Sequence, residues 1–105
     1  MPNRALVIAV THNAVREELK IARPGSHPWP DRPMGLSGGA GYGFTEDTLR
    51  DFVLRCVAAM KQAPQLAEVR DRFDRPEVVS EDLLGGNVTG FKQWLGFDIC
   101  DQLGI

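Results

Sequence analysis

A run of prolines and glycines divides this chain into two parts. Residues 24–44 read PGSHPWPDRPMGLSGGAGYGF and hold four of the seven prolines and six of the eleven glycines. Each proline disfavours the helical conformation in the residue before it, and each glycine gives the backbone access to positive φ angles. We therefore predict a loop over residues 24–44, with regular structure confined to residues 1–23 and 45–105.

The chain length indicates one domain. A chain of 105 residues can bury one modest core, which leaves no room for a second independently folding unit. Loops of about twenty residues are uncommon inside compact domains, and they are often functional or disordered. We expect residues 1–105 to form a single domain that contains the Pro/Gly-rich loop.

The N-terminal part begins with an apolar run. Residues 4–10 read RALVIAV, and the lack of alternation between apolar and polar residues is typical of a strand covered on both faces. Residues 12–22, HNAVREELKIA, allow two interpretations. They form a helix with an apolar face, or they turn and return as a second strand of a hairpin. The spacing of Glu17 and Lys20 slightly favours the helix, and the choice stays open.

Strong helix signals begin at Thr45. This threonine can act as an N-cap, and Glu46 and Asp47 follow in the first turn, where the helix dipole favours negative charge. Apolar residues then recur at helical spacing on one face: Leu49, Phe52, Val53, Cys56, Val57 and Met60. Pro64 ends this helix and can begin another.

Two further helical segments are predicted after Pro64. The first runs towards Pro76 and carries apolar residues at helical spacing: Leu66, Val69 and Phe73. After a short turn capped by Ser80, the last helix begins near Thr89 and includes Gly96, which weakens it. Its apolar face comprises Phe91, Trp94, Leu95, Ile99 and Leu103. The predicted fold class is α+β, with one or two N-terminal β-strands packed against a C-terminal part of three or more helices.

The charge pattern argues against nucleic-acid and membrane partners. Twelve Lys and Arg stand against fourteen Asp and Glu, and the net charge is -2. The basic residues form no cluster of the kind that neutralises phosphates along a nucleic acid. The apolar run near the N-terminus is too short to span a bilayer and lacks the flanks of a secretory signal. We expect a soluble, cytoplasmic protein.

The glycine-rich segment does not fit a nucleotide site. Gly39, Gly41 and Gly43 resemble part of the dinucleotide fingerprint G-x-G-x-x-G. However, no strand precedes them, and Phe44 stands where the third glycine should be. Glu46 and Asp47 would place two carboxylates where the phosphate should sit. We therefore expect this segment to be a connector, or a lid or recognition loop that presents aromatic side chains.

Metal binding and cysteine nucleophiles are not expected. His12, His27, Cys56 and Cys100 are spread along the chain without the spacing of a zinc site. Cys56 falls on an apolar helix face, and the aspartates near Cys100 would raise the pKa of its thiol. The sequence predicts no cofactor and no metal.

Two histidines are candidates for acid–base catalysis. His12 follows the predicted first strand, and His27 lies within SHPWP. Histidine transfers protons readily near neutral pH, so either residue could serve as general acid or base beneath the glycine-rich loop. The corresponding function is a small isomerase, lyase or hydrolase, which is the alternative interpretation.

Aromatic residues favour a binding function. The loop carries Trp29, Tyr42 and Phe44, while the C-terminal segment carries more aromatic residues than one short helix buries on one stripe: Phe91, Trp94 and Phe97. Exposed aromatic surface marks interfaces. We therefore expect a small non-enzymatic binding protein, a regulator, inhibitor or accessory subunit, that engages a protein partner or a second copy through the loop and the last helix.

Overall fold

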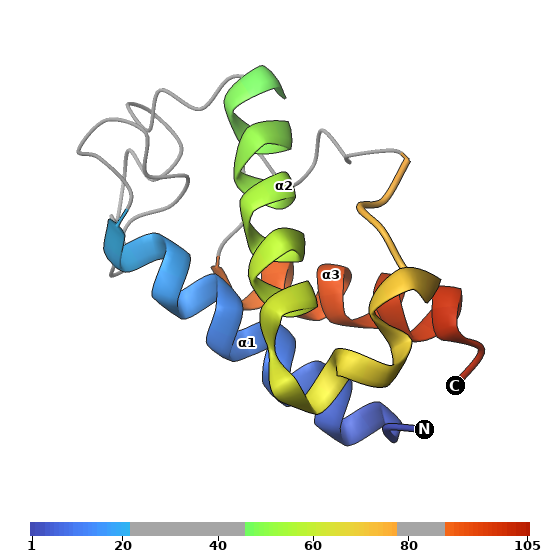
Figure 1. Ribbon diagram of the computed structural model, residues 1–105. Helices are drawn as coiled ribbons and strands as arrows, with labels where there is room; N and C mark the ends of the chain where they lie inside the picture. The colour runs from blue at the N-terminus through green and yellow to red at the C-terminus, as the bar shows by residue number, and fades with distance from the viewer. Residues whose placement is uncertain (22–45, 78–87) are drawn as a thin grey trace.

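The structure, a computed structural model, describes residues 1–21, 46–77 and 88–105. Across these ranges the regular elements are all helical and no strand occurs (Figure 1): α1 (Arg4–Ile21), α2 (Glu46–Gln62), the 3₁₀ helix η2 (Pro64–Arg72) and α3 (Val88–Leu103). The prediction of an α+β fold with N-terminal strands is therefore wrong. The predictions for residues 24–44 and for the turn at Ser80 fall outside the described residues.

Helix α1 replaces the predicted strand because a helical stripe is hidden in its apolar run. The buried residues recur at intervals of three or four positions: Val7, Val10, Thr11, Ala14 and Val15. At the N-terminus of the helix, Asn3 Oδ1 accepts a hydrogen bond from the backbone amide of Leu6 at 2.8 Å. This cap satisfies a donor that the helix itself leaves unpaired. Of the two interpretations left open for residues 12–22, the structure shows the helix as far as Ile21 and not the returning strand.

Helix α2 agrees with the sequence pattern. All six side chains of its predicted apolar face are buried, including Cys56, which is a free thiol. The proposed cap, Thr45, lies outside the described residues. The chain then turns at Ala63 and enters η2, whose predicted apolar residues Leu66 and Val69 are buried, as is Phe73 just beyond it. The second helical segment is confirmed, in the tighter 3₁₀ form.

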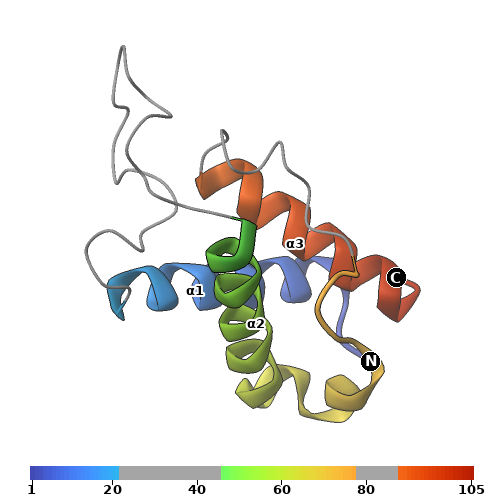
Figure 2. The same ribbon diagram turned by 90° about the horizontal axis from the view of Figure 1, so that it is seen from above.

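Helices α1 and α3 lie side by side and run antiparallel (Figures 1 and 2). The Cys100 thiol is 3.9 Å from the carbonyl oxygen of Arg4, and Ile8 faces Gly96. Helix α2 crosses α1 steeply, and its Phe52 ring meets the Phe91 ring of α3 with centroids 5.6 Å apart. The core therefore lies between the antiparallel pair on one side and α2 with η2 on the other.

Gly96 lies on the face of α3 that packs against Ile8 and Thr11 of α1. A Cβ atom at this position would stand 3.4 Å from Ile8 Cγ1 and 3.6 Å from Thr11 Oγ1, which is ordinary van der Waals contact. There is room for a methyl group and none for a branched side chain, because the Ile8 backbone lies only 3.7 Å away. The packing of the two helices at this position therefore admits glycine or alanine and disfavours larger side chains.

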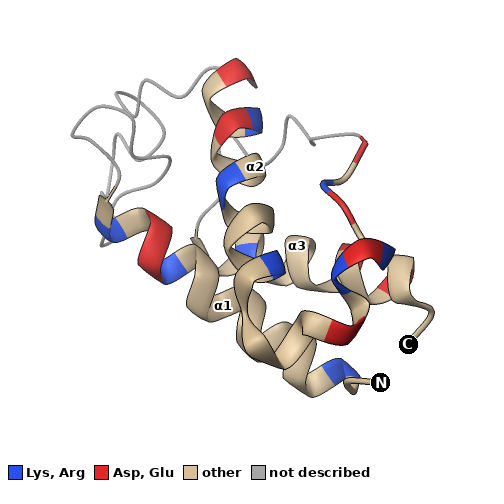
Figure 3. Ribbon diagram, viewed as in Figure 1, with Lys and Arg blue, Asp and Glu red and all other residues tan. Residues whose placement is uncertain are grey.

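Figure 3 shows acidic and basic residues interspersed along α2 and over residues 64–77. This mixed distribution is consistent with the small net charge of -2. Among the described residues, no helix is both long enough and apolar enough to cross a membrane.

Substitutions at Gly96 test the close approach of the helices. Gly96→Ala should raise the free energy of unfolding by up to about 1 kcal/mol, because alanine improves helix propensity and its methyl group fits. Gly96→Val should lower the free energy of unfolding by about 1–3 kcal/mol, because its branches force α1 and α3 apart. Urea denaturation followed by far-UV circular dichroism measures both, and equal stabilities of the two variants would contradict the close contact.

The cap of α1 can be tested in the same way. Asn3→Ala should lower the free energy of unfolding by about 1 kcal/mol, because the Leu6 amide loses its acceptor. Asn13→Ala is the matched control: this asparagine is exposed in the middle of the same helix and caps nothing. Thermal unfolding of the two variants compares them, and a smaller loss for Asn3→Ala than for Asn13→Ala would be inconsistent with the cap.

Candidate functional site

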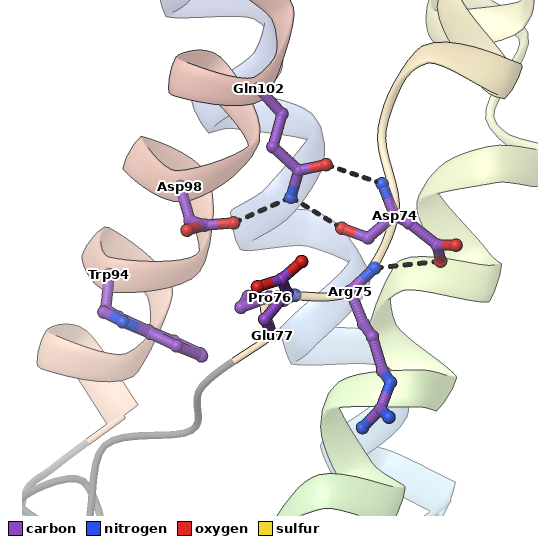
Figure 4. A pocket seen from close by; sticks show the side chains of 7 residues that line it. All are labelled: Asp74, Arg75, Pro76, Glu77, Trp94, Asp98 and Gln102. Atoms are coloured by element: carbon purple, nitrogen blue, oxygen red, sulfur yellow. Dashed lines mark hydrogen bonds between the residues drawn. The ribbon is translucent and has the colours of Figure 1, made fainter.

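A groove lies between α3 and the segment that follows η2. Its volume is about 810 Å³. The side chains that line it come from residues 74–77 and from one flank of α3 (Figure 4): Asp74, Arg75, Pro76, Glu77, Trp94, Asp98 and Gln102. The α3 residues are spaced four apart, so they follow one another along the helix.

Gln102 holds the two walls of the groove together. Its Oε1 accepts a hydrogen bond from the Asp74 backbone amide, and its Nε2 donates to the Asp74 carbonyl oxygen, both at 2.8 Å. The same Nε2 also donates to Asp98 Oδ2 at 2.8 Å. A side-chain amide here pairs with an extended backbone as a neighbouring strand would, and the segment is thereby fastened to α3.

Trp94 forms the aromatic wall of the groove. Its ring packs against the buried Phe91 ring with centroids 5.8 Å apart and planes at 40°, so its orientation is fixed from the core side. The ring is half-buried and borders the groove. Figure 4 shows the carboxylates of Asp98 and Glu77 near the same space, while the Arg75 guanidinium extends away from α3. The groove therefore offers an aromatic face beside negative charge.

The predicted partner-binding aromatics fall into three different environments. Phe91 is fully buried and fills the core. Trp94 lines the groove, and Phe97 is 43 % exposed beneath the Arg4 guanidinium, whose carbon is 5.1 Å from the ring centroid. The exposure of Phe97 agrees with its position off the apolar face of α3. The loop aromatics lie outside the described residues: Trp29, Tyr42 and Phe44.

His12 lies at a second, smaller depression of about 500 Å³ on the surface of α1. The residues that line it are Ala9, His12, Asn13, Arg16 and, from α3, Lys92. Partial burial, followed by the positive charge of Lys92, lowers the pKa of His12. None of these five lining residues carries a carboxylate that could orient the imidazole for proton transfer. The other candidate, His27, lies outside the described residues.

The two cysteines do not form an activated nucleophile. Both are free and buried, and burial is the largest cause that raises the pKa of the Cys56 thiol and of the Cys100 thiol. Thiols with a raised pKa are poor nucleophiles near neutral pH. Within residues 1–21, 46–77 and 88–105, no group of three His, Cys, Asp or Glu side chains is arranged to hold a metal ion.

Comparison with protein families, curated proteins and solved structures found no match to this chain. Among the groove residues, sequence reasoning singled out only Trp94. The recurrence of Trp94, Asp98 and Gln102 at intervals of four along one helix was the signal that could have added the other two. Residues 74–77 gave no such signal, because the contact with α3 spans 28 positions in the sequence.

Removal of the Gln102 side-chain amide tests the hydrogen bonds that hold residue 74 against α3. In Gln102→Ala, exchange of the Asp74 amide proton should become about fivefold faster, because that donor loses its partner. Gln93→Ala, on an exposed position of the same helix outside the groove, should leave this exchange rate unchanged. Hydrogen exchange followed by NMR measures both variants, and identical rates would rule out the described contact in solution.

Proposed function

We propose that this chain is a small non-enzymatic binding protein whose groove holds a short segment of a partner protein that carries a lysine or arginine. The observation that supports it is the placement of the Trp94 ring beside the Asp98 and Glu77 carboxylates in a groove of about 810 Å³. Such a protein would serve as a regulator, an inhibitor or an accessory subunit.

The chemistry of the groove favours a basic side chain. A guanidinium or ammonium group over the face of Trp94 is attracted by the negative face of the ring. The carboxylates of Asp98 and Glu77 can accept charge-assisted hydrogen bonds from the same group. The aliphatic stem of a lysine or arginine would pack against Trp94, which is half-buried, and so cover apolar surface.

The structure of the groove also favours binding without large rearrangement. Trp94 rests on Phe91 in the core, and residue 74 is held to α3 by the paired hydrogen bonds of Gln102. Walls that are fixed before the partner arrives reduce the ordering cost of association. The groove is open to solvent, which suits a peptide segment better than a small molecule that must be enclosed.

The binding proposal can be tested with dye-labelled peptides. A mixture of octapeptides with arginine fixed at the fourth position should bind at least about tenfold more tightly than the same mixture with glutamate there. Trp94→Ala and Asp98→Asn should each reduce this affinity by about tenfold. Fluorescence anisotropy at low ionic strength measures the affinities.

The matched control for these variants is Asp101→Asn. Asp101 is an exposed acid on the same helix and does not line the groove, so the change removes the same charge without altering the proposed contacts. Equal binding of the arginine and glutamate mixtures, or an equal effect of Asp101→Asn and Asp98→Asn, would overturn the proposal. Binding of a second copy in place of the peptides would show as a concentration-dependent mass in light scattering.

A further inference from the structure

The depression at His12 gathers positive charge from two helices. Along α1, one face presents Ala9, His12, Asn13 and Arg16, and across from it α3 contributes Lys92. The antiparallel alignment that sets Ile8 against Gly96 places His12 one turn further on, near Lys92. Three of the five lining side chains can carry positive charge, and none carries negative charge.

The contacts of Arg16 with Asn13 and Glu17 leave part of its guanidinium available to a ligand. Its NH2 group donates to Asn13 Oδ1 at 2.7 Å, which fixes the side chain along the helix. Its Nε atom lies 3.9 Å from Glu17 Oε1. That same carboxylate oxygen is closer to Lys20 Nζ, at 3.1 Å, and lies on a half-exposed side chain. Glu17 therefore neutralises Arg16 only weakly.

One ring nitrogen of His12, the buried Nε2 atom, lacks a hydrogen-bond partner among the described residues. Burial and the nearby Lys92 charge both lower the pKa of His12, so the free protein disfavours the imidazolium. Among the described residues, the charged side chains that line the depression with His12 are Arg16 on its own helix and Lys92 on α3. An anion bound in the depression would stabilise the imidazolium and so raise the pKa of His12.

We propose that the depression lined by His12, Asn13, Arg16 and Lys92 binds a small phosphate-bearing molecule, either inorganic phosphate or a phosphate monoester. Several converging cations stabilise a bound tetrahedral dianion more strongly than a bound planar monoanion. Lys92 supplies a point charge, Arg16 supplies guanidinium donors, and the Asn13 amide adds neutral donors. The volume of about 500 Å³ leaves space for the organic part of an ester. This site is separate from the groove and does not depend on its function.

The pKa of His12 reports directly on an anion bound beside it. We would use His27→Gln, which leaves His12 as the single imidazole, and titrate its ring protons by NMR in chloride and in inorganic phosphate at constant ionic strength. Saturating phosphate should raise the pKa of His12 by about one pH unit, because the dianion stabilises the imidazolium. Glycerol 3-phosphate in place of inorganic phosphate shows whether an ester binds more tightly.

Variants that each remove one positive charge distinguish binding in the depression from attraction to the overall charge of the protein. Lys92→Gln and Arg16→Gln should each weaken phosphate binding at least about fivefold. Lys92→Gln should also raise the pKa of His12 without phosphate, because it removes a neighbouring positive charge. Arg55→Gln removes one charge from an exposed pair on α2 and should leave binding unchanged.

The proposal is overturned if neither phosphate nor its ester changes the pKa of His12 relative to chloride. It is also overturned if Arg55→Gln weakens binding as much as Lys92→Gln, since the attraction would then follow net charge alone. Circular dichroism of every variant confirms that the helices persist, so that a loss of binding reflects the site.

Discussion

The contact between α1 and α3 at Gly96 determines the arrangement of the other elements. Ile8 and Thr11 of α1 face Gly96 of α3 so closely that a Cβ atom there would be in van der Waals contact with both. The Arg4 guanidinium donates to the carbonyl oxygen of Ile105 at 2.9 Å, which fixes the far end of the pair. Helix α2 can then cross this pair and close the core through the Phe52–Phe91 ring contact.

Both candidate binding surfaces follow from that pairing. One flank of α3 faces α1 and brings Lys92 to His12, so that two helices share one basic depression. Another flank of α3, which carries Trp94, lies opposite residues 74–77, and the groove lies between them. The two surfaces differ in charge: the depression is lined by cations, while the groove pairs an aromatic wall with carboxylates. A single helix, α3, therefore contributes to two surfaces of different charge.

The helices after residue 45 were readable from the sequence, and the start of the N-terminal helix was not. In α2 and α3 the apolar residues recur at helical spacing between polar ones, so the buried face stands out. In residues 4–10 the exposed positions are themselves apolar, as at Ala5 and Ala9, and the period disappears into a continuous run. Asn3 was the overlooked signal, because an N-cap asparagine favours a helix start. The groove depends on a contact between Asp74 and Gln102, which no local pattern encodes.

The most direct test of this account is a nuclear Overhauser measurement on the isotope-labelled protein. The account predicts cross-peaks between the Ile8 methyl protons and the Gly96 α protons, together with sequential amide–amide contacts along residues 4–21. That result would establish α1 as a helix in antiparallel register with α3. Cross-strand contacts from residues 4–10, with no cross-peak between Ile8 and Gly96, would contradict the helix pairing on which both surfaces depend.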